Sequence, residues 1–322
     1  MMFLCGWGIR SGLGHYNRDL AEKLGAVWIV PRHWESVSLL ESTAEMIHVS
    51  RDIRNWPADI FRQMDRLIIV ETEYVTGLVR VAKSFGAKVI CVAMYEHLHL
   101  DRAWTNYVDQ WLAPTQQCYD YLRHRNKSVR RVPACVDVNR FLFRKREIAE
   151  VFLFVNGRGG MANRKGLRVI LEMARRLPHE SFIVMSQVPI REQIPDHVKV
   201  MRETFSNVNL YDVGDICIQP SRFEGLGLQF LECQAAGMPL ITTDGPPMNQ
   251  YNAIALIQAD QREVDLHGRK IIAFDARVDH LVEIVKGVSG KNIALESIAA
   301  RKYVEDNASW DVCLDGIKNK IL

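Results

Sequence analysis

The sequence predicts an α/β protein built from two Rossmann-like domains, each with a parallel sheet covered by helices on both faces. Short apolar segments typical of buried strands alternate with segments of helical periodicity throughout the 322 residues. Glycine-rich turns follow several of these strands and open the next helix, as in doubly wound sheets. The length also fits two domains, each large enough for a core of its own.

The predicted elements follow one another in a regular order. In the first half, strands are expected at residues 2–7, 27–30, 67–71, 88–94, 111–113 and 129–132, and helices at 15–24, 74–85 and 115–123. In the second half, strands are expected at residues 151–156, 181–186, 216–219 and 240–243. The helix at 165–177 repeats apolar residues at helical spacing, and Pro178 ends it.

The change of domain is expected at residue 146, which gives domains at 1–146 and 147–322. Residues 144–150 form a charged stretch of the kind found in linkers. No apolar run reaches the roughly 18 residues of a membrane-spanning helix. Residues 1–7 lack a basic leader, which indicates a first strand and not a signal peptide.

Seven cysteines are scattered along the chain without Cys-x-x-Cys spacing. This pattern favours reduced thiols over disulfides or a zinc site. We therefore expect a cytoplasmic protein, and the sequence leaves its oligomeric state open.

The most informative motif spans residues 219–232, where a strand end leads through a Gly-x-Gly turn into a helix. Glu224 precedes the turn Gly225-Leu226-Gly227-Leu228, and Glu232 lies about one turn into the helix. Free N–H groups at a helix N-terminus bind phosphate, and the flanking carboxylates can accept hydrogen bonds from sugar hydroxyls. This combination favours a nucleotide-sugar over a bare nucleotide. The alternative is a capped helix with an acidic surface residue.

A second polar loop follows the strand at 151–156. It contains Arg158 and then Arg164 and Lys165, at the start of the next helix. Cations are unfavourable at a helix N-terminus unless an anion binds there. Arg158 and Lys165 are therefore candidates for binding an anion, and Arg164 is a substitute for Arg158. The alternative is a polar loop without a ligand.

The loop at residues 6–15 follows the first strand and opens a helix. A dinucleotide site requires Gly-x-Gly-x-x-Gly and an acidic residue after the second strand. Ser11 replaces the third glycine, and the second strand ends in Val30-Pro31-Arg32, which disfavours NAD. Gly12 and Gly14 are candidates for a close approach of the backbone to a ligand. The alternative is a tight strand-to-helix turn.

Polar residues also follow two other strands of the first half. Glu96 and His97 come after the strand at 88–94, and Glu71 and Glu73 lie at and after the end of the strand at 67–71. Because ligands bind outside the carboxyl ends of parallel strands, these residues are candidates for a site. The alternative is that each is a structural residue with its polar atoms satisfied.

Together the motifs resemble the retaining glycosyltransferases of the GT-B fold (glycosyl transferases group 1, family 4-like). That family carries Glu-x7-Glu with glycines after the first Glu, and then a helix that ends in Ala-x-Gly-x-Pro. The corresponding residues here are Glu224, Glu232 and Ala235-Ala236-Gly237-Met238-Pro239. Arg158 and Lys165 match, in order, the Gly-Arg and Lys-Gly of the family's donor loop. The resemblance is specific over residues 151–244 and only topological over 1–150.

The resemblance implies two Rossmann-like domains facing each other across a cleft, with a terminal helix that crosses back to the first domain. It implies transfer of a hexosyl or pentosyl group from a nucleoside-diphosphate sugar to a hydroxyl acceptor, with retention. We expect front-face substitution, in which the donor phosphate helps to remove the acceptor proton. No Asp-x-Asp motif is present, so we expect no obligatory metal or other cofactor.

The resemblance also implies roles for individual residues. Arg158 and Lys165 would stabilise the leaving diphosphate, Glu224 would hold the donor sugar, and Glu232 would hold the ribose. The loop with Gly12 and Gly14 would border the diphosphate and the acceptor. Glu96 or His97 would lie near the donor sugar.

The distribution of charge bears on the acceptor. The first 150 residues contain 21 basic and 17 acidic residues, and a basic run extends from residue 123 to residue 146. A polyanion such as hydroxymethylated DNA, an anionic glycan or a lipid phosphate is therefore one candidate acceptor, and a small neutral molecule is the other. The candidate contacts for a polyanion are Arg123, Arg125, Arg130 and Arg131. The alternative is that the basic run is a solvated face or a linker between domains.

Two other classes of function stay open at this point. A non-catalytic nucleotide-sugar-binding protein would have less need of Arg158, Lys165, Glu224 and Glu232 together. A Rossmann oxidoreductase is disfavoured by the first glycine loop. Hydrolysis of a nucleotide-sugar without acceptor would separate a transferase from a binding protein.

Overall fold

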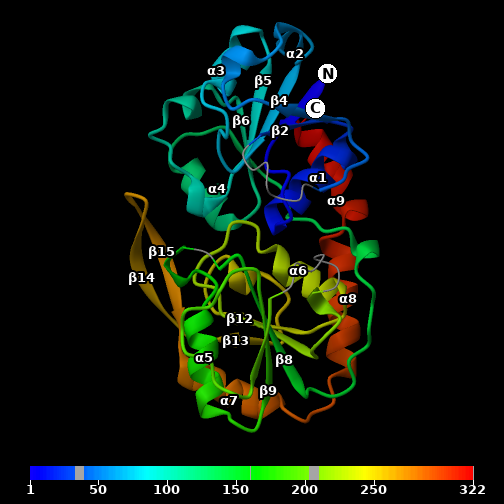
Figure 1. Ribbon diagram of the computed structural model, residues 1–322, viewed down its shortest axis with the longest axis vertical. Helices are drawn as coiled ribbons and strands as arrows, with labels where there is room; N and C mark the ends of the chain where they lie inside the picture. Colours follow the sequence, from blue (N-terminus) through cyan, green and yellow to red (C-terminus); the bar gives the residue numbers. More distant parts are fainter. Residues whose placement is uncertain (33–39, 160, 203–209, 322) are drawn as a thin grey trace. The chain divides into compact units, whose positions relative to one another are not determined.

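The computed structural model describes residues 1–32, 40–159, 161–202 and 210–321, and Figure 1 shows its helices and strands. The chain divides into two compact units. Unit 1 comprises residues 1–134 and the residues from Cys313 onward, and unit 2 comprises residues 135–312. Residues 135–146, which the sequence assigned to the first domain, therefore lie in unit 2.

Among the described residues, unit 1 is built on a seven-stranded parallel sheet of order β3-β2-β1-β4-β5-β6-β7. The strands are β1 (Met2–Cys5), β2 (Val27–Pro31), β3 (Met46–Val49), β4 (Arg66–Val70), β5 (Lys88–Val92), β6 (Gln110–Ala113) and β7 (Val129–Arg131). The helices are α1 (Gly12–Leu24), α2 (Ala58–Arg62), α3 (Leu78–Ser84), α4 (Gln116–Arg123) and most of α9 (Trp310–Ile321). The strand order reverses between β1 and β4, where Rossmann-type sheets bind ligands.

The described part of unit 2 contains a six-stranded parallel sheet of order β10-β9-β8-β11-β12-β13. The strands are β8 (Val151–Gly157), β9 (Ser181–Ser186), β10 (Val198–Met201), β11 (Ile216–Gln219), β12 (Leu240–Thr243) and β13 (Ala255–Ile257). The helices are α5 (Leu167–Arg176), α6 (Leu228–Ala235), α7 (Val278–Val288) and α8 (Ala294–Asn307). This order reverses between β8 and β11.

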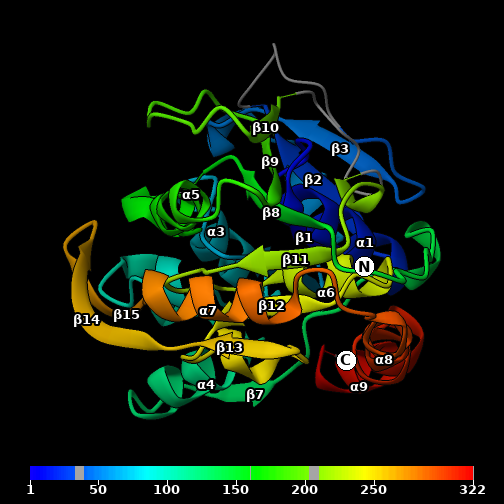
Figure 2. The same ribbon diagram turned by 90° about the horizontal axis from the view of Figure 1, so that it is seen from below.

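The central strands β11 and β12 are buried along their whole length. Parallel strands covered on both faces require continuous apolar runs of this kind. Ile170 of α5 and Leu281 of α7 belong to one hydrophobic core with strand residues such as Phe154. Helix α6 packs against α8, and Figure 2 shows α5 and α8 on opposite sides of the sheet. The alternation of strands and helices thus predicted the layers correctly.

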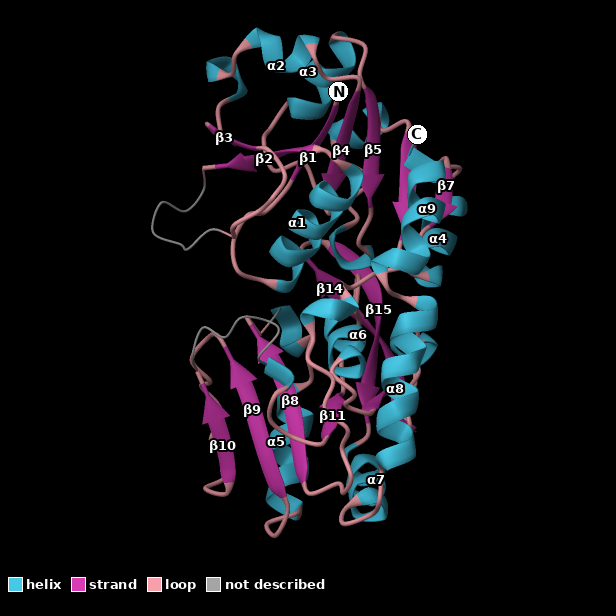
Figure 3. Cartoon of the chain, turned by 90° about the vertical axis from the view of Figure 1, so that its right-hand side faces the viewer, coloured by secondary structure: helices cyan, strands magenta, loops and turns pink. Residues whose placement is uncertain are grey.

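Parts of the fold were not predicted from the sequence, among them the strands β3, β10 and β13 and the antiparallel hairpin of β14 (Ala259–Leu266) and β15 (Arg269–Ala276). The hairpin is labelled in Figure 3. His267 and Gly268, with φ of 55° and 80°, form its two-residue turn, and Leu266 pairs with Arg269. Two positive φ values match the twist of the flanking strands. A His-Gly pair between alternating residues was the available signal.

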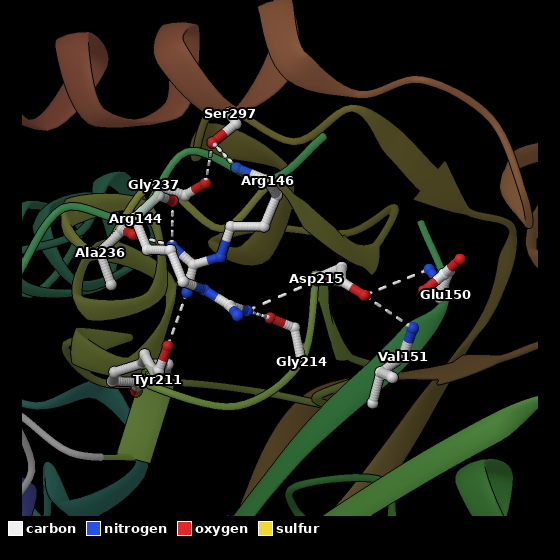
Figure 4. Close-up of polar contacts among 10 residues, drawn as sticks. All are labelled: Arg144, Arg146, Glu150, Val151, Tyr211, Gly214, Asp215, Ala236, Gly237 and Ser297. Atoms are coloured by element: carbon white, nitrogen blue, oxygen red, sulfur yellow. Dashed lines mark hydrogen bonds and ion pairs between the residues drawn. The ribbon is translucent and has the colours of Figure 1, made fainter. Parts of the chain in front are cut away.

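The stretch at 144–150 is part of unit 2, and Arg146 is buried there. Figure 4 shows its polar contacts. Its guanidinium donates to the carbonyls of Ala236, of Arg144 (2.6 Å) and of Tyr211 (2.6 Å). The Arg146 N–H donates to Ser297 Oγ at 3.0 Å. Burial, and then the charge of Arg144, lower the pKa of Arg146 to about 10. The residue therefore anchors the start of unit 2, and the expectation of a solvated basic run is wrong at this position.

Candidate functional site

The loops that follow β8 and β11 lie at the point where the strand order of unit 2 reverses. The first carries Arg158, Arg164 and Lys165, and the second carries Glu224. Gly166 allows the two loops to meet, because its φ is 81° and a Cβ there would lie 2.2 Å from the carbonyl oxygen of Pro220. The sheet topology and this close approach bring the predicted cations and the predicted carboxylate together.

Glu224 is buried between polar partners from both loops. Its Oε1 accepts from Lys165 Nζ at 2.6 Å, from Ser221 Oγ at 2.8 Å and from Gln229 Nε2 at 2.7 Å. Its Oε2 lies 3.7 Å from Nη1 of Arg164. One carboxylate oxygen is therefore fully engaged by donors, and the other faces a cation at a longer distance.

The charge of Glu224 is maintained despite burial. Burial alone would raise the pKa of Glu224, but the charges of Lys165 and Arg164 and the hydrogen bonds from Lys165 and Ser221 hold it below its usual range. A buried carboxylate with two cations is an electrostatically preorganised group. The site can therefore hold a second, negatively charged or hydroxylated group next to the same cations.

We expect acid to remove the contribution of Glu224 to stability. Because its folded pKa is lowered, this contribution is present above the unfolded pKa and is lost as pH falls through the folded pKa. The melting temperature of Glu224→Gln should thus be lower than that of wild type at about pH 7, with the gap narrowing as pH falls below the unfolded pKa of Glu224. Thermal unfolding at a series of pH values measures this gap. Glu283→Gln, on the exposed face of α7, is the control, and a gap independent of pH would contradict the expectation.

Arg158 is exposed, whereas Arg164 and Lys165 are partly buried. The ion pairs to Glu224 come from Arg164 and Lys165 and not from Arg158. The turn that follows Glu224 ends at Gly227, the N-cap of α6, which has a φ of 63°. Gly225, Leu226, Gly227 and Leu228 thus lie beside Glu224 at the start of this helix, as the spacing predicted.

Glu232 lies in α6 and is buried. Its Oε2 accepts a hydrogen bond from the hydroxyl of Tyr211 at 2.8 Å. Burial and the nearby charge of Glu232 raise the pKa of Tyr211 well above its usual value, so this hydroxyl remains a donor. Tyr211 was missed from the sequence, because it belongs to no motif and meets Glu232 only through the fold.

In unit 1, polar residues gather after three neighbouring strands, β1, β4 and β5. Oε1 of Glu71 lies 3.2 Å from Nε2 of His97, and the Tyr74 hydroxyl donates to Oε2 of Glu71. The ring of Trp7 contacts that of Tyr74 edge-on, at a centroid distance of 5.4 Å. Glu71 has a φ of 72°, a strained conformation for a residue with a side chain, which is found most often at functional sites.

The other candidates of unit 1 have different surroundings. Glu96 is buried beside His97, and Glu73 accepts from the N–H of Val79 at 2.8 Å. Burial raises the pKa of Glu73. Gly12 and Gly14 lie in the first turn of α1, where the hydroxyl of Ser11 accepts from the Gly14 N–H at 3.1 Å. The structure brings Glu71 and His97 together, a pairing that the sequence did not predict.

The basic run is divided between the two units. Arg123, Arg125 and Arg130 are exposed in unit 1, and the guanidinium of Arg125 lies 3.7 Å from the centroid of the Tyr121 ring. Arg131 is half-buried and donates to the carbonyl of Ala113 at 3.0 Å. The later part of the run, with Arg144 and Arg146, belongs to unit 2.

Each of the seven cysteines is a buried thiol. Within the described ranges, no group of three or more His, Cys, Asp or Glu residues is placed to hold a metal ion. No described helix is both long enough and apolar enough to cross a membrane.

Comparison with known proteins finds one family that matches part of the chain. Residues 149–266 match the family "Glycosyl transferases group 1". No curated protein sequence matches the chain.

Solved structures resemble the chain over its whole length. HepE from Anabaena, in a complex with UDP and glucose, has a TM-score of 0.72 at 11% identity and covers 99% of this chain and 98% of its own. Sucrose-phosphate synthase from Thermosynechococcus elongatus has a TM-score of 0.70 at 13% identity, covering 99% and 97%. A glycosyltransferase from Rickettsia africae has a TM-score of 0.68 at 12% identity, again covering 99% and 97%. At these identities the likeness concerns the fold, which is that of the GT-B enzymes.

The family match covers the β8 and β11 loops described above, and both parallel sheets have the strand order of Rossmann-like units. The fold class predicted from the sequence is therefore confirmed. The chain has the fold of the GT-B glycosyltransferases, and residues 149–266 of its unit 2 carry the sequence pattern of the group 1 glycosyl transferases.

Proposed function

We propose that the protein transfers a glycosyl group from a nucleoside-diphosphate sugar to a hydroxyl acceptor with retention of configuration, without an obligatory metal. The observation that carries the proposal is the buried Glu224 carboxylate, held between Lys165 and Arg164 at the reversal of strand order in unit 2. Support comes from HepE, a structure of the same fold in complex with UDP and glucose.

In the proposed donor complex, Lys165, Arg164 and Arg158 neutralise the diphosphate. The ammonium of Lys165 has three N–H donors, so it can keep its bond to Oε1 of Glu224 and still donate to a phosphate oxygen. Oε2 of Glu224, which faces Arg164 at 3.7 Å, is the oxygen we assign to a hydroxyl of the donor sugar. Glu232 accepts from the ribose, with Tyr211 fixing the orientation of its carboxylate.

In the proposed reaction, the acceptor oxygen forms a bond to the anomeric carbon on the face that the diphosphate leaves. The bond between that carbon and the phosphate oxygen breaks, and the acceptor proton passes to the leaving diphosphate. The cations stabilise the charge that develops on this group. The residues Glu71 and His97 of unit 1 are proposed to hold the acceptor through hydrogen bonds.

Variants of the two carboxylates test the donor assignment. Glu232→Ala should weaken binding of the nucleoside diphosphate on the order of tenfold, because a charge-assisted hydrogen bond is lost. Glu224→Ala should instead lower kcat by at least about tenfold, because its partner is the sugar that moves. Binding is measured by calorimetry with UDP, GDP and ADP, and turnover is measured in EDTA. Glu172→Ala, on the exposed face of α5, is the control. Wild-type binding and turnover in both variants would refute the assignment.

Hydrolysis of a nucleotide-sugar without acceptor separates the proposal from a binding protein without catalysis. The proposed transferase releases nucleoside diphosphate slowly from its donor, since water can replace the acceptor. A protein that binds the donor but releases no diphosphate, with or without hydroxyl compounds, would be a binding protein.

Arg123, Arg125 and Arg130 are the exposed arginines of the part of the basic run that lies in unit 1, and they are accessible to an anionic acceptor such as DNA. We propose a polyanion as one acceptor class on this ground. The affinity of the protein for DNA should then fall steeply as the salt concentration rises. Reversing the charge of Arg123 and Arg130 should make that affinity less dependent on salt. Donor hydrolysis serves as the control and should not change. Binding that is insensitive to salt would indicate a small neutral acceptor.

A further inference from the structure

Arg222 connects three segments of unit 2. Its Nε donates to Oδ1 of Asp275 in β15 at 2.5 Å, and its Nη1 donates to the carbonyl of Ala162 in the β8 loop. Its own N–H donates to the carbonyl of Arg164 at 2.8 Å. The side chain is 16% exposed; its bond to Asp275 is partly buried, and its bond to Ala162 lies at the surface. Arg222 stands two residues before Glu224, and none of its bonds is made to Glu224 itself.

The segment that Arg222 holds is strained. Ala162 and Asn163 both have left-handed backbone conformations, with φ of 52° and 54°. Residues with side chains adopt this conformation at a cost, and it persists only where the surroundings fix it. The next two residues are Arg164 and Lys165, whose side chains point to Glu224. The bonds of Arg222 to residues 162 and 164 therefore fix the backbone from which both cations project.

The hairpin of β14 and β15 supplies the fixed end of this connection. Asp275 accepts from the side chain of Arg222, and the neighbouring Phe274 donates its N–H to the carbonyl of Arg222 at 2.9 Å. The Phe274 ring covers the backbone of Gly245 so closely that a Cβ there would lie 2.3 Å from it. The end of β15 is thus attached both to the β11 loop and to the turn after β12.

We infer that Arg222 is a positioning residue for the diphosphate cations, and that the hairpin of β14 and β15 holds it in place. Through the carbonyls of Ala162 and Arg164, Arg222 sets the direction in which Arg164 and Lys165 project. Asp275 keeps the guanidinium in the orientation that this requires. The inference rests on the proposed donor site and adds to it a part of the chain outside the donor motifs.

The experiment compares Arg222→Ala with Arg262→Ala. Arg262 lies in β14 and pairs with the other oxygen of Asp275, at 3.1 Å, and no bond of it reaches the β8 loop in the described structure. Affinity for inorganic pyrophosphate and for UDP, kcat and KM for donor hydrolysis, and the melting temperature are measured for both. Arg222→Ala should bind both ligands about tenfold more weakly and lower kcat by about tenfold or more, since a small misplacement of charged groups is costly. Arg262→Ala should bind and turn over like wild type.

Two further variants separate positioning from general stability. Arg222→Lys keeps the charge and can donate to the Ala162 carbonyl, so it should recover part of the lost affinity. Asp275→Asn should weaken pyrophosphate binding in the wild-type background but have little further effect in Arg222→Ala, because the two residues act through one contact. Wild-type binding and kcat in Arg222→Ala would overturn the inference, as would an equal loss in Arg262→Ala. If the losses of pyrophosphate affinity caused by Asp275→Asn and by Arg222→Ala were additive, the role assigned to the hairpin would be wrong. If wild type itself neither binds UDP, GDP or ADP nor hydrolyses a donor, the proposed function fails instead.

Discussion

Lys165→Ala is expected to lower kcat by ~10²–10³-fold, the effect of removing one preorganised group that stabilises developing charge. Lys165 is 13% exposed and lies 2.6 Å from Glu224, so its ammonium is held in place before the donor binds. Its loss removes a cation from the leaving diphosphate and also leaves the buried Glu224 with Arg164 as its remaining ion-pair partner among the described residues. Both effects act on the transition state more than on donor binding, so KM should change less than kcat.

Steady-state kinetics of donor hydrolysis and of transfer measure this effect. Arg168→Ala is the matched control, because Arg168 lies in the first turn of α5, three residues after Lys165, but is 74% exposed and pairs with Glu192 at 3.5 Å. Its turnover should equal that of wild type. A Lys165→Ala variant that folds and retains wild-type kcat would show that the diphosphate is bound elsewhere.

Arg146→Ala is expected to lower the free energy of unfolding by about 3–5 kcal/mol, because it leaves a cavity and unpaired buried carbonyls. The side chain is 2% exposed and bonds to Ala236 and Tyr211, which lie far from it in sequence. Ala236 ends the helix that carries Glu232, and Tyr211 donates to Glu232. Removal of the Arg146 side chain should therefore also weaken binding of the nucleoside diphosphate.

Chemical denaturation measures the stability, and calorimetry measures the binding. Lys145→Ala is the control, because the neighbouring Lys145 is exposed and pairs with the exposed Glu147 at 2.9 Å. Exposed pairs contribute at most about 1 kcal/mol. Equal stability of the two variants would mean that the bonds of Arg146 do not anchor unit 2.

The site features that could be predicted from the sequence are those set by local chemistry. Gly166 and Gly227 have positive φ, and both stand at helix starts that the glycine spacing predicted. The central strands were predicted because their buried apolar runs are continuous. The hairpin of β14 and β15 was missed because β14 consists mostly of exposed, charged or polar residues that resemble a loop.

Contacts between residues that are far apart in the sequence could not be predicted in this way. Tyr211 reaches Glu232 across 21 residues, and Glu71 meets His97 only because β4 and β5 are neighbours in the sheet. Both residues of the second pair were candidates, but their contact depends on strand order, and spacing along the chain does not determine that order. Arg222 is a further case, since its partners lie 53 and 60 residues away.

The division of the chain has a consequence for how the protein is made. Unit 2 is a single stretch of sequence, whereas unit 1 is completed only by residues that follow unit 2. The segments at which the chain enters and leaves unit 2 are hydrogen-bonded to each other, from Val136 to Ala308 and from Trp310 to Val136. During synthesis on the ribosome, unit 2 can therefore close while the sheet of unit 1 still lacks α9. Unit 1 therefore emerges first and is completed last, because its sheet lacks α9 until residues 313–321 have left the ribosome.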